Sequence, residues 1–151
     1  MSKKHPVIAI TGSSGAGTSS VKNAFNHLFE RVGAKPVVIE GDSFHRYDRE
    51  EMKRVMEKKE KIGNKYFSHF GPEANLFSEL EKTFKDYGEK GHCNRRYYIH
   101  TDEEGDPFGK KAGEFTPWED AGRNSDLLFY EGLHGGVKDG SIDVAKYVDL
   151  L

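Results

Sequence analysis

Cysteine is nearly absent from this sequence of 151 residues. The one cysteine, Cys93, rules out an internal disulfide and is typical of a protein from a reducing compartment. We expect its thiol to be inert. His92 and His100 lie near it in the sequence, but nothing completes the spacing of a zinc site. Excess charge is also absent: the net charge of −2 argues against a dedicated nucleic-acid surface.

Long apolar runs are missing as well. The apolar run nearest the N-terminus, Val7–Thr11, is too short for the core of a signal peptide. No stretch approaches the roughly 18 apolar residues that a membrane-spanning helix needs. We therefore expect a cytoplasmic protein that binds neither a membrane nor nucleic acid.

A glycine-rich loop directly after that run is the most informative feature present. It follows the phosphate-binding pattern G-x-x-x-x-G-K-[ST], although Thr18 occupies the lysine position. Backbone N–H groups of such a loop, and the positive end of the helix after it, can surround a polyphosphate, and Ser19 can reach its magnesium ion. An ordinary strand-to-helix turn is the alternative. The residues predicted to bind nucleotide are Gly12, Ser13, Ser14, Gly15, Ala16, Gly17, Thr18 and Ser19.

The flanking sequence predicts a βαβ unit. Apolar residues recur at helical spacing from Val21 to Val32 and stop at Gly33, and a second apolar run, Val37–Ile39, follows. Asp48 is placed to cap a further, charged helix. Strand, helix and strand in this order predict an α/β fold in which a parallel sheet is flanked by helices, as in P-loop kinases.

The rest of the chain continues this pattern less regularly. We predict a helix from Pro72 to Gly88, a short strand at Arg96–His100 and a buried strand at Leu127–Glu131. The last segment, Ala145–Leu151, looks like the approach to another core strand, and the sequence stops inside it. We therefore expect residues 1–151 to be the N-terminal part of one truncated domain.

Two carboxylates complete a candidate site. Asp42 follows the second strand and Glu131 ends the third, so both should meet the loop at the carboxyl edge of the sheet, where ligands bind in parallel sheets. Phosphoryl transfer to an alcohol needs a phosphate cradle, a magnesium site and a group that orients or deprotonates the hydroxyl, roles that fit the loop with Ser19, Glu131 and Asp42. Asp42 could instead be a turn residue and helix cap.

Several blocks of sequence resemble the bacterial branch of the phosphoribulokinase family. They are Ser2–Pro6, the glycine-rich loop, Glu40–Arg46, Phe67–Phe70 with Glu73–Asn75, and Tyr130–Gly135. The resemblance covers essentially all 151 residues. It also accounts for Thr18, because the bacterial branch carries threonine at that position.

The resemblance implies an activity and roles for particular residues. Members of the family transfer the γ-phosphoryl group of MgATP to the 1-hydroxyl of D-ribulose 5-phosphate, and the full-length form is expected to be a homo-oligomer. Asp42 would be the catalytic base and Glu131, with Ser19, would hold Mg²⁺. His45 and Arg49 would bind the sugar phosphate; Arg49 lies about one helical turn beyond His45, although it could also be a surface arginine paired with a neighbouring glutamate.

One departure from the family limits this expectation. Its members are about twice as long, and the other half carries a basic segment, further sugar-phosphate contacts and the nucleotide base pocket. We therefore expect weak activity from these 151 residues alone. The alternatives are a uridine kinase-like enzyme, a GTP-driven switch, which the absence of an Asn-Lys-x-Asp motif disfavours, and an inactive nucleotide-binding fragment.

Overall fold

Three parallel strands form the central sheet. β1 (Val7–Thr11) and β2 (Pro36–Glu40) lie on either side of β5 (Leu127–Gly132), and Glu40 lies opposite Glu131. All three strands therefore end at the same edge of the sheet. The structure is a computed structural model that describes residues 4–13, 15–64, 67–68 and 70–151.

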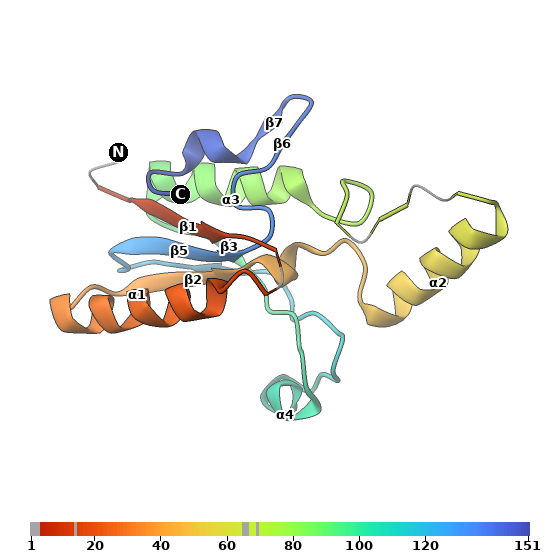
Figure 1. The fold of residues 1–151 in the computed structure, drawn as a ribbon. Helices are drawn as coiled ribbons and strands as arrows, with labels where there is room; N and C mark the ends of the chain where they lie inside the picture. Colours follow the sequence, from red (N-terminus) through yellow and green to blue (C-terminus); the bar gives the residue numbers. More distant parts are fainter. Residues whose placement is uncertain (1–3, 14, 65–66, 69) are drawn as a thin grey trace.

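One long helix covers each face of the sheet. α1 (Thr18–Val32) lies on one face and α3 (Phe77–Lys90) on the other (Figure 1). Alternate residues of the strands point to opposite faces, so the sheet supplies apolar side chains to two separate clusters. The larger cluster, on the α3 face, includes Val7, Ala9, Val37, Ile39, Leu80, Phe84, Tyr87, Leu128 and Tyr130. The smaller, on the α1 face, is built on Phe29, Leu127 and Phe129.

α1 matches the predicted helix and ends at Gly33, whose left-handed φ of 71° suits glycine. Its predicted apolar stripe is only partly a core face. Phe25 and Phe29 pack against Phe129, whereas three other members of the stripe are exposed. These are Val21, Leu28 and Val32.

α2 (Arg49–Lys61) begins where the sequence predicts. The Asp48 carboxylate accepts a hydrogen bond from the Glu51 backbone N–H at 2.8 Å, and the Glu51 carboxylate accepts one from the Asp48 N–H at 2.9 Å. This reciprocal capping satisfies backbone donors that the first helical turn leaves unpaired. The helix lies to the side of the layered core (Figure 1).

The predicted boundaries of α3 are wrong at both ends. The helix begins at Phe77 rather than near Pro72, because the preceding residues pair with another segment instead of entering a helical turn. It runs through Gly88 and ends at Gly91, which has a left-handed φ of 78° and donates its N–H to the Tyr87 carbonyl at 2.8 Å. A glycine inside a helix is tolerated at a modest cost, so Gly88 alone does not stop it.

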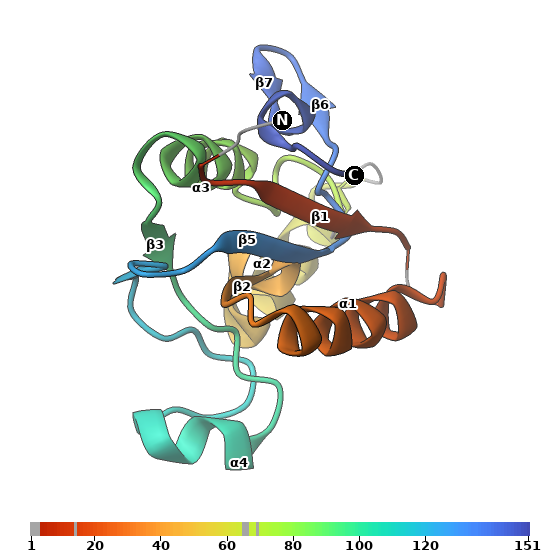
Figure 2. The ribbon, with the colours of Figure 1, turned by 90° about the vertical axis from the view of Figure 1, so that its left-hand side faces the viewer.

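The strand predicted at Arg96–His100 is present only as one isolated antiparallel bridge, between Tyr98 and Phe115. The regular strand lies just before it, as β3 (Cys93–Arg95), and pairs antiparallel with β4 (Glu119–Ala121). Between them the chain makes a long excursion that carries α4 (Asp102–Gly105) away from the layers (Figure 2). Cys93 is buried, and its burial raises the pKa of its thiol to about 12, in keeping with an inert residue.

The last residues return to the sheet. A small hairpin, β6 (Lys138–Asp139) and β7 (Ile142–Asp143), leads to a 3₁₀ turn, after which Leu150 pairs in parallel with β1. The Ala9 N–H donates to the Leu150 carbonyl at 2.8 Å. The predicted approach to a further strand is therefore present. None of the helices in the described part of the chain is long and apolar enough to cross a membrane.

Candidate active site

The glycine-rich loop joins the end of β1 to the first turn of α1. Gly15 and Gly17 have left-handed φ values of 83° and 85°, which residues with a side chain rarely adopt. Gly17 caps α1 without a side chain of its own, and no acidic residue lies in the first turn. The N–H groups at the start of α1 are therefore not competed for by a local carboxylate, and the helix end favours an anion. Ser14, one of the predicted loop residues, lies outside the described residues.

A crevice of about 450 Å³ opens where the three strands end. It brings together the loop, Asp42 and Glu131, as their positions in the sequence predict. Further residues to which the sequence analysis gave no role in the site also line it, among them Lys22, Glu40, Phe70 and His100. Lys22 lies one helical turn beyond Thr18, so helical spacing from the loop could have pointed to it.

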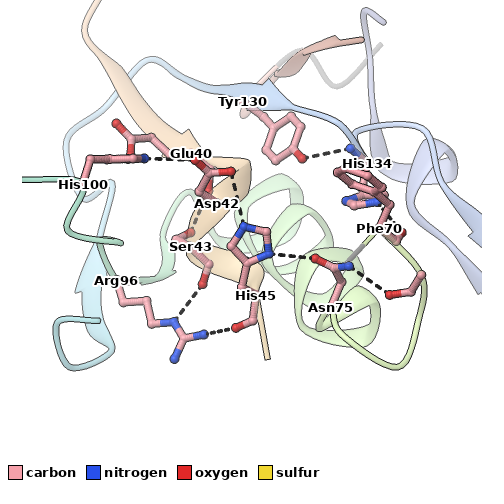
Figure 3. Close-up of polar contacts among 11 residues, drawn as sticks. Glu40, Asp42, Ser43, His45, Phe70, Asn75, Arg96, His100, Tyr130 and His134 are labelled. Atoms are coloured by element: carbon pink, nitrogen blue, oxygen red, sulfur yellow. Dashed lines mark hydrogen bonds and ion pairs between the residues drawn. The ribbon is translucent and has the colours of Figure 1, made fainter. Parts of the chain in front are cut away.

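Asp42 lies in a short 3₁₀ turn, Gly41–Phe44, directly after β2. Its carboxylate contacts two histidines, His45 (Nε2 to Oδ1, 3.5 Å) and His100 (Nε2 to Oδ2, 3.0 Å), which are drawn in Figure 3. The contact with His45 is the largest cause of a shift that lowers the pKa of Asp42 to about 2; burial opposes this shift and the His100 contact adds to it. Asp42 is consequently ionised at neutral pH.

His100 reaches the crevice from the excursion between β3 and β4. Its Nδ1 lies 3.2 Å from the Glu104 carboxylate, on the other side of the ring from Asp42. Burial disfavours the charged ring, but the hydrogen bonds to Asp42 and Glu104 prevail and raise the pKa of His100. No sequence pattern indicated this role, because His100 is 58 positions from Asp42 in a region without regular periodicity.

His45 and Arg49 line a second cavity of about 460 Å³, which we call the side cavity. The predicted spacing of one helical turn between them is wrong, because His45 has an extended backbone (φ −61°, ψ 139°) and α2 begins only at Arg49. Both residues nevertheless share the cavity. Because His45 also contacts Asp42, the side cavity adjoins the crevice.

Arg96 supports the turn that carries Asp42 and His45. Its guanidinium donates hydrogen bonds to the backbone carbonyls of Ser43 at 2.8 Å and His45 at 2.6 Å (Figure 3). It also stacks on the rings of Phe115 and Trp118, at 3.7 and 4.6 Å from their centroids. Burial lowers the pKa of Arg96 to about 10, so it remains charged at neutral pH. The turn is thus held by a distant segment of the chain.

The relative position of Asp42 and Glu131 is set by the close contact between their neighbours, Gly41 and Gly132. A Cβ on Gly41 would lie 2.7 Å from the Tyr130 hydroxyl and 2.8 Å from the Cα of Gly132. Such distances leave no room for a side chain, so glycine is required here for close packing. The Tyr130 hydroxyl accepts a hydrogen bond from the His134 N–H at 3.3 Å (Figure 3). The Glu131 carboxylate makes no hydrogen bond or ion pair with the described residues, whereas the backbone of Glu131 pairs within the sheet.

The comparisons with known proteins agree with this architecture. The sequence matches the Phosphoribulokinase / Uridine kinase family over residues 7–151. It is 58% identical over its whole length to the chromosomal phosphoribulokinase of Cupriavidus necator and 54% identical over 99% of its length to the phosphoribulokinase of Nitrobacter vulgaris. The chain therefore belongs to the phosphoribulokinase/uridine kinase family.

A solved structure supports the same assignment. The phosphoribulokinase from Rhodobacter spheroides superposes with a TM-score of 0.86 at 45% identity, over 98% of this chain and 50% of that one. The predicted α/β fold with a P-loop kinase-like parallel sheet is thereby confirmed. The chain spans about half the length of the curated relatives it matches, 52% in both cases.

Proposed function

We propose that these 151 residues are the N-terminal part of the kinase domain of a phosphoribulokinase. The proposed reaction transfers the γ-phosphoryl group of MgATP to the 1-hydroxyl of D-ribulose 5-phosphate and gives ribulose 1,5-bisphosphate. One observation carries the proposal: the glycine-rich loop, Asp42 and Glu131 share a crevice, and a cavity lined by His45 and Arg49 adjoins it at Asp42. The names of the relatives point to the same activity.

The loop side of the crevice would hold ATP. The N–H groups of the loop and of the first turn of α1 would donate hydrogen bonds to the phosphates. Because Thr18 carries no positive charge, we assign the neutralising role of the missing loop lysine to Lys22, which lines the same crevice. Gly15 and Gly17 let the backbone approach the phosphates closely.

The crevice also suits Mg²⁺. Ser19 and Glu131 line it and offer a hydroxyl and a carboxylate, the hard oxygen ligands that this ion prefers. When bound, Mg²⁺ neutralises charge on the transferring phosphates. We expect Glu131→Gln in the full-length enzyme, a chain of the relatives' length that contains these residues, to raise the magnesium concentration needed for half-maximal turnover and to lower the maximal rate. If neither the half-maximal magnesium concentration nor the maximal rate changes, Glu131 has a structural role and does not bind Mg²⁺.

Asp42 would act as the base for the sugar hydroxyl. With a pKa of about 2 it accepts a hydrogen bond readily but holds a proton poorly. Its low pKa comes largely from contact with His45 and partly from contact with His100. A phosphorylated acceptor that shares the hydrogen-bonding capacity of these two rings would weaken both contacts, and the pKa of Asp42 would rise toward a value suited to proton transfer.

The side cavity would bind the acceptor. His45 and Arg49 would donate charge-assisted hydrogen bonds to the 5-phosphate, while Asp42 at the boundary between cavity and crevice faces the 1-hydroxyl. A nucleoside such as uridine carries no phosphate for these groups. This difference separates the proposal from the uridine kinase alternative within the same family.

The test is a substrate panel with the full-length enzyme. ADP release is measured with ribulose 5-phosphate, ribulose, uridine and no acceptor, at fixed MgATP. We expect turnover with ribulose 5-phosphate, a large loss of kcat/KM for ribulose, and only background with uridine. Turnover with uridine, or equal rates with ribulose and its phosphate, would reject the proposal.

Three further expectations depend on the same proposal. The 151 residues alone should bind ATP and turn over poorly, since the relatives are about twice as long. The full-length form should be a homo-oligomer, which light scattering checks, and cytoplasmic, which cell fractionation checks.

A further inference from the structure

Asn75 is a buried polar residue that lies opposite His45. It is 3% exposed and belongs to a short segment that pairs antiparallel with the turn after Asp42. The Arg46 N–H donates to the Ala74 carbonyl at 2.8 Å, and the Leu76 N–H donates to the Phe44 carbonyl at 2.7 Å. These two bonds fix the backbone on both sides of Asn75.

The orientation of the Asn75 amide follows from its partners. Its Nδ2 lies 2.9 Å from the carbonyl oxygen of Gly71, which can only accept a hydrogen bond, so this atom is the amide nitrogen. The other atom, Oδ1, lies 3.0 Å from the Nδ1 of His45 and can only accept. The His45 Nδ1 must therefore carry a proton and donate it.

The second ring nitrogen of His45 then has a defined role. Its Nε2 lies 3.5 Å from the Asp42 carboxylate (Figure 3). With Nδ1 engaged by Asn75, Nε2 is the ring nitrogen turned toward Asp42 and the boundary of the crevice and the side cavity.

Other charged and titratable groups lie around His45. Arg96 holds its backbone carbonyl, the Tyr98 ring packs edge-on at 5.9 Å between centroids, and His134 is close enough for the two rings to repel each other when charged. The side cavity adds charges of both signs, from Asp48, Arg49, Lys53, Glu57 and Glu60. None of these groups replaces Asn75 as the partner of Nδ1.

We propose that Asn75 is a positioning residue for His45: by accepting a hydrogen bond from Nδ1 it fixes the ring so that Nε2 is the nitrogen presented at the boundary of crevice and side cavity. In this way the inference deepens the proposed function and rests on it for its meaning, because Nε2 is then the ring atom that meets a phosphorylated acceptor. Asn75 touches neither substrate in this scheme and acts only through His45.

The direct test is NMR of the histidine ring nitrogens in the 151-residue chain at neutral pH, with His45 assigned from the His45→Gln spectrum. We expect Nδ1 of His45 to be protonated in the unaltered chain. Asn75→Leu removes the acceptor at similar volume and should release Nδ1, so that its proton exchanges between the two ring nitrogens. An unprotonated Nδ1 in the unaltered chain, or unchanged His45 signals in Asn75→Leu, would overturn the inference.

Asn75→Asp gives a second readout if the leucine variant does not fold. It keeps an oxygen acceptor and adds negative charge beside Nδ1, so Nδ1 should stay protonated and its proton signal should move downfield as the hydrogen bond strengthens. Asn94→Asp, on the exposed part of β3, adds the same charge away from His45 and is the matched control. Equal His45 Nδ1 signals in the two aspartate variants would also overturn the inference.

Kinetics of the full-length enzyme complete the test. Asn75→Leu should raise KM for ribulose 5-phosphate about tenfold, the scale of one charge-assisted hydrogen bond, and leave KM for ATP unchanged. An equal rise in both KM values would reduce Asn75 to a structural residue. If NMR gives the expected protonation but the enzyme phosphorylates uridine, the positioning of His45 stands and the proposed acceptor falls, so the two failures are distinguishable.

Discussion

The glycine-rich loop and the turn with Asp42 and His45 are built by different means. On the loop side, the proposed phosphate ligands come from the backbone of one continuous stretch, which Gly15 and Gly17 shape through their left-handed φ values. On the side of the proposed acceptor, the turn with Asp42 and His45 is held by side chains from remote segments, Arg96 and Asn75. A backbone-built site depends on local conformation, whereas a side-chain-built site depends on the correct packing of the whole domain.

This contrast predicts that the acceptor side is the more sensitive to single substitutions. The largest expected effect is at Asp42. Asp42→Asn in the full-length enzyme should lower kcat by about 10²–10⁴-fold, the usual range for loss of a general base, with little change in KM for ATP. Steady-state kinetics with both substrates varied measures this. Asp139→Asn in the β6–β7 hairpin is the control, and near-normal turnover of Asp42→Asn would end the assignment.

The next largest effect is expected at Arg96, which supports the turn that carries Asp42 and His45. Arg96→Lys keeps the charge but loses the paired hydrogen bonds and the stacking on two rings, so kcat/KM for ribulose 5-phosphate should fall by about 10- to 100-fold. KM for ATP should stay within about twofold. Arg123→Lys, at an exposed ion pair, is the control. An equal loss on the ATP side would mean that Arg96 supports the fold as a whole rather than the acceptor side.

A substitution of Lys22 tests whether the loop side of the crevice binds ATP. Lys22→Met removes the lysine that lines the crevice beside Thr18, and KM for ATP should rise by about tenfold while KM for ribulose 5-phosphate stays constant. Lys35→Met, just before β2 and thus at the opposite edge of the sheet, is the matched control. If both lysine variants bind ATP alike, the loop backbone alone suffices for the phosphates.

The smallest expected effect concerns stability. The pKa of Asp42 is lower in the folded chain, about 2, than its ordinary value of 3.8, so the unfolded chain binds more protons between these values. Asp42 therefore stabilises the fold above about pH 4, and this contribution is lost as the pH falls toward 2. Because its side chain is 55% exposed, solvent screening limits the contribution to at most about 1 kcal/mol.

Urea unfolding of the 151-residue chain between pH 5 and pH 2 measures this effect. The free energy of unfolding should fall less steeply with acid in Asp42→Asn than in the unaltered chain. Parallel curves would show that the contacts of Asp42 with His45 and His100 contribute nothing to stability.

The same contrast explains what the sequence could predict. The loop, the three strands and the cap at Asp48 are encoded locally, by glycine placement, apolar runs and a capping residue, so they were predicted. The start of α3 was not, because residues 74–76 pair with the turn after Asp42 and this long-range pairing prevails over local helical signals. His100 and Arg96 were missed for a related reason: only the folded excursion between β3 and β4 brings them to Asp42.

The contact between Gly41 and Gly132 has a mechanical consequence. Gly41 precedes Asp42 and Gly132 follows Glu131. The distance between the backbones at Asp42 and Glu131 is therefore set by direct contact between the main chains of the two glycines and by their contact with the Tyr130 side chain. Main-chain atoms have no rotamers to lose when a ligand arrives, so this spacing is fixed before binding and costs little entropy to maintain. The crevice thus holds the backbones of its two acidic residues at a fixed separation before any substrate binds.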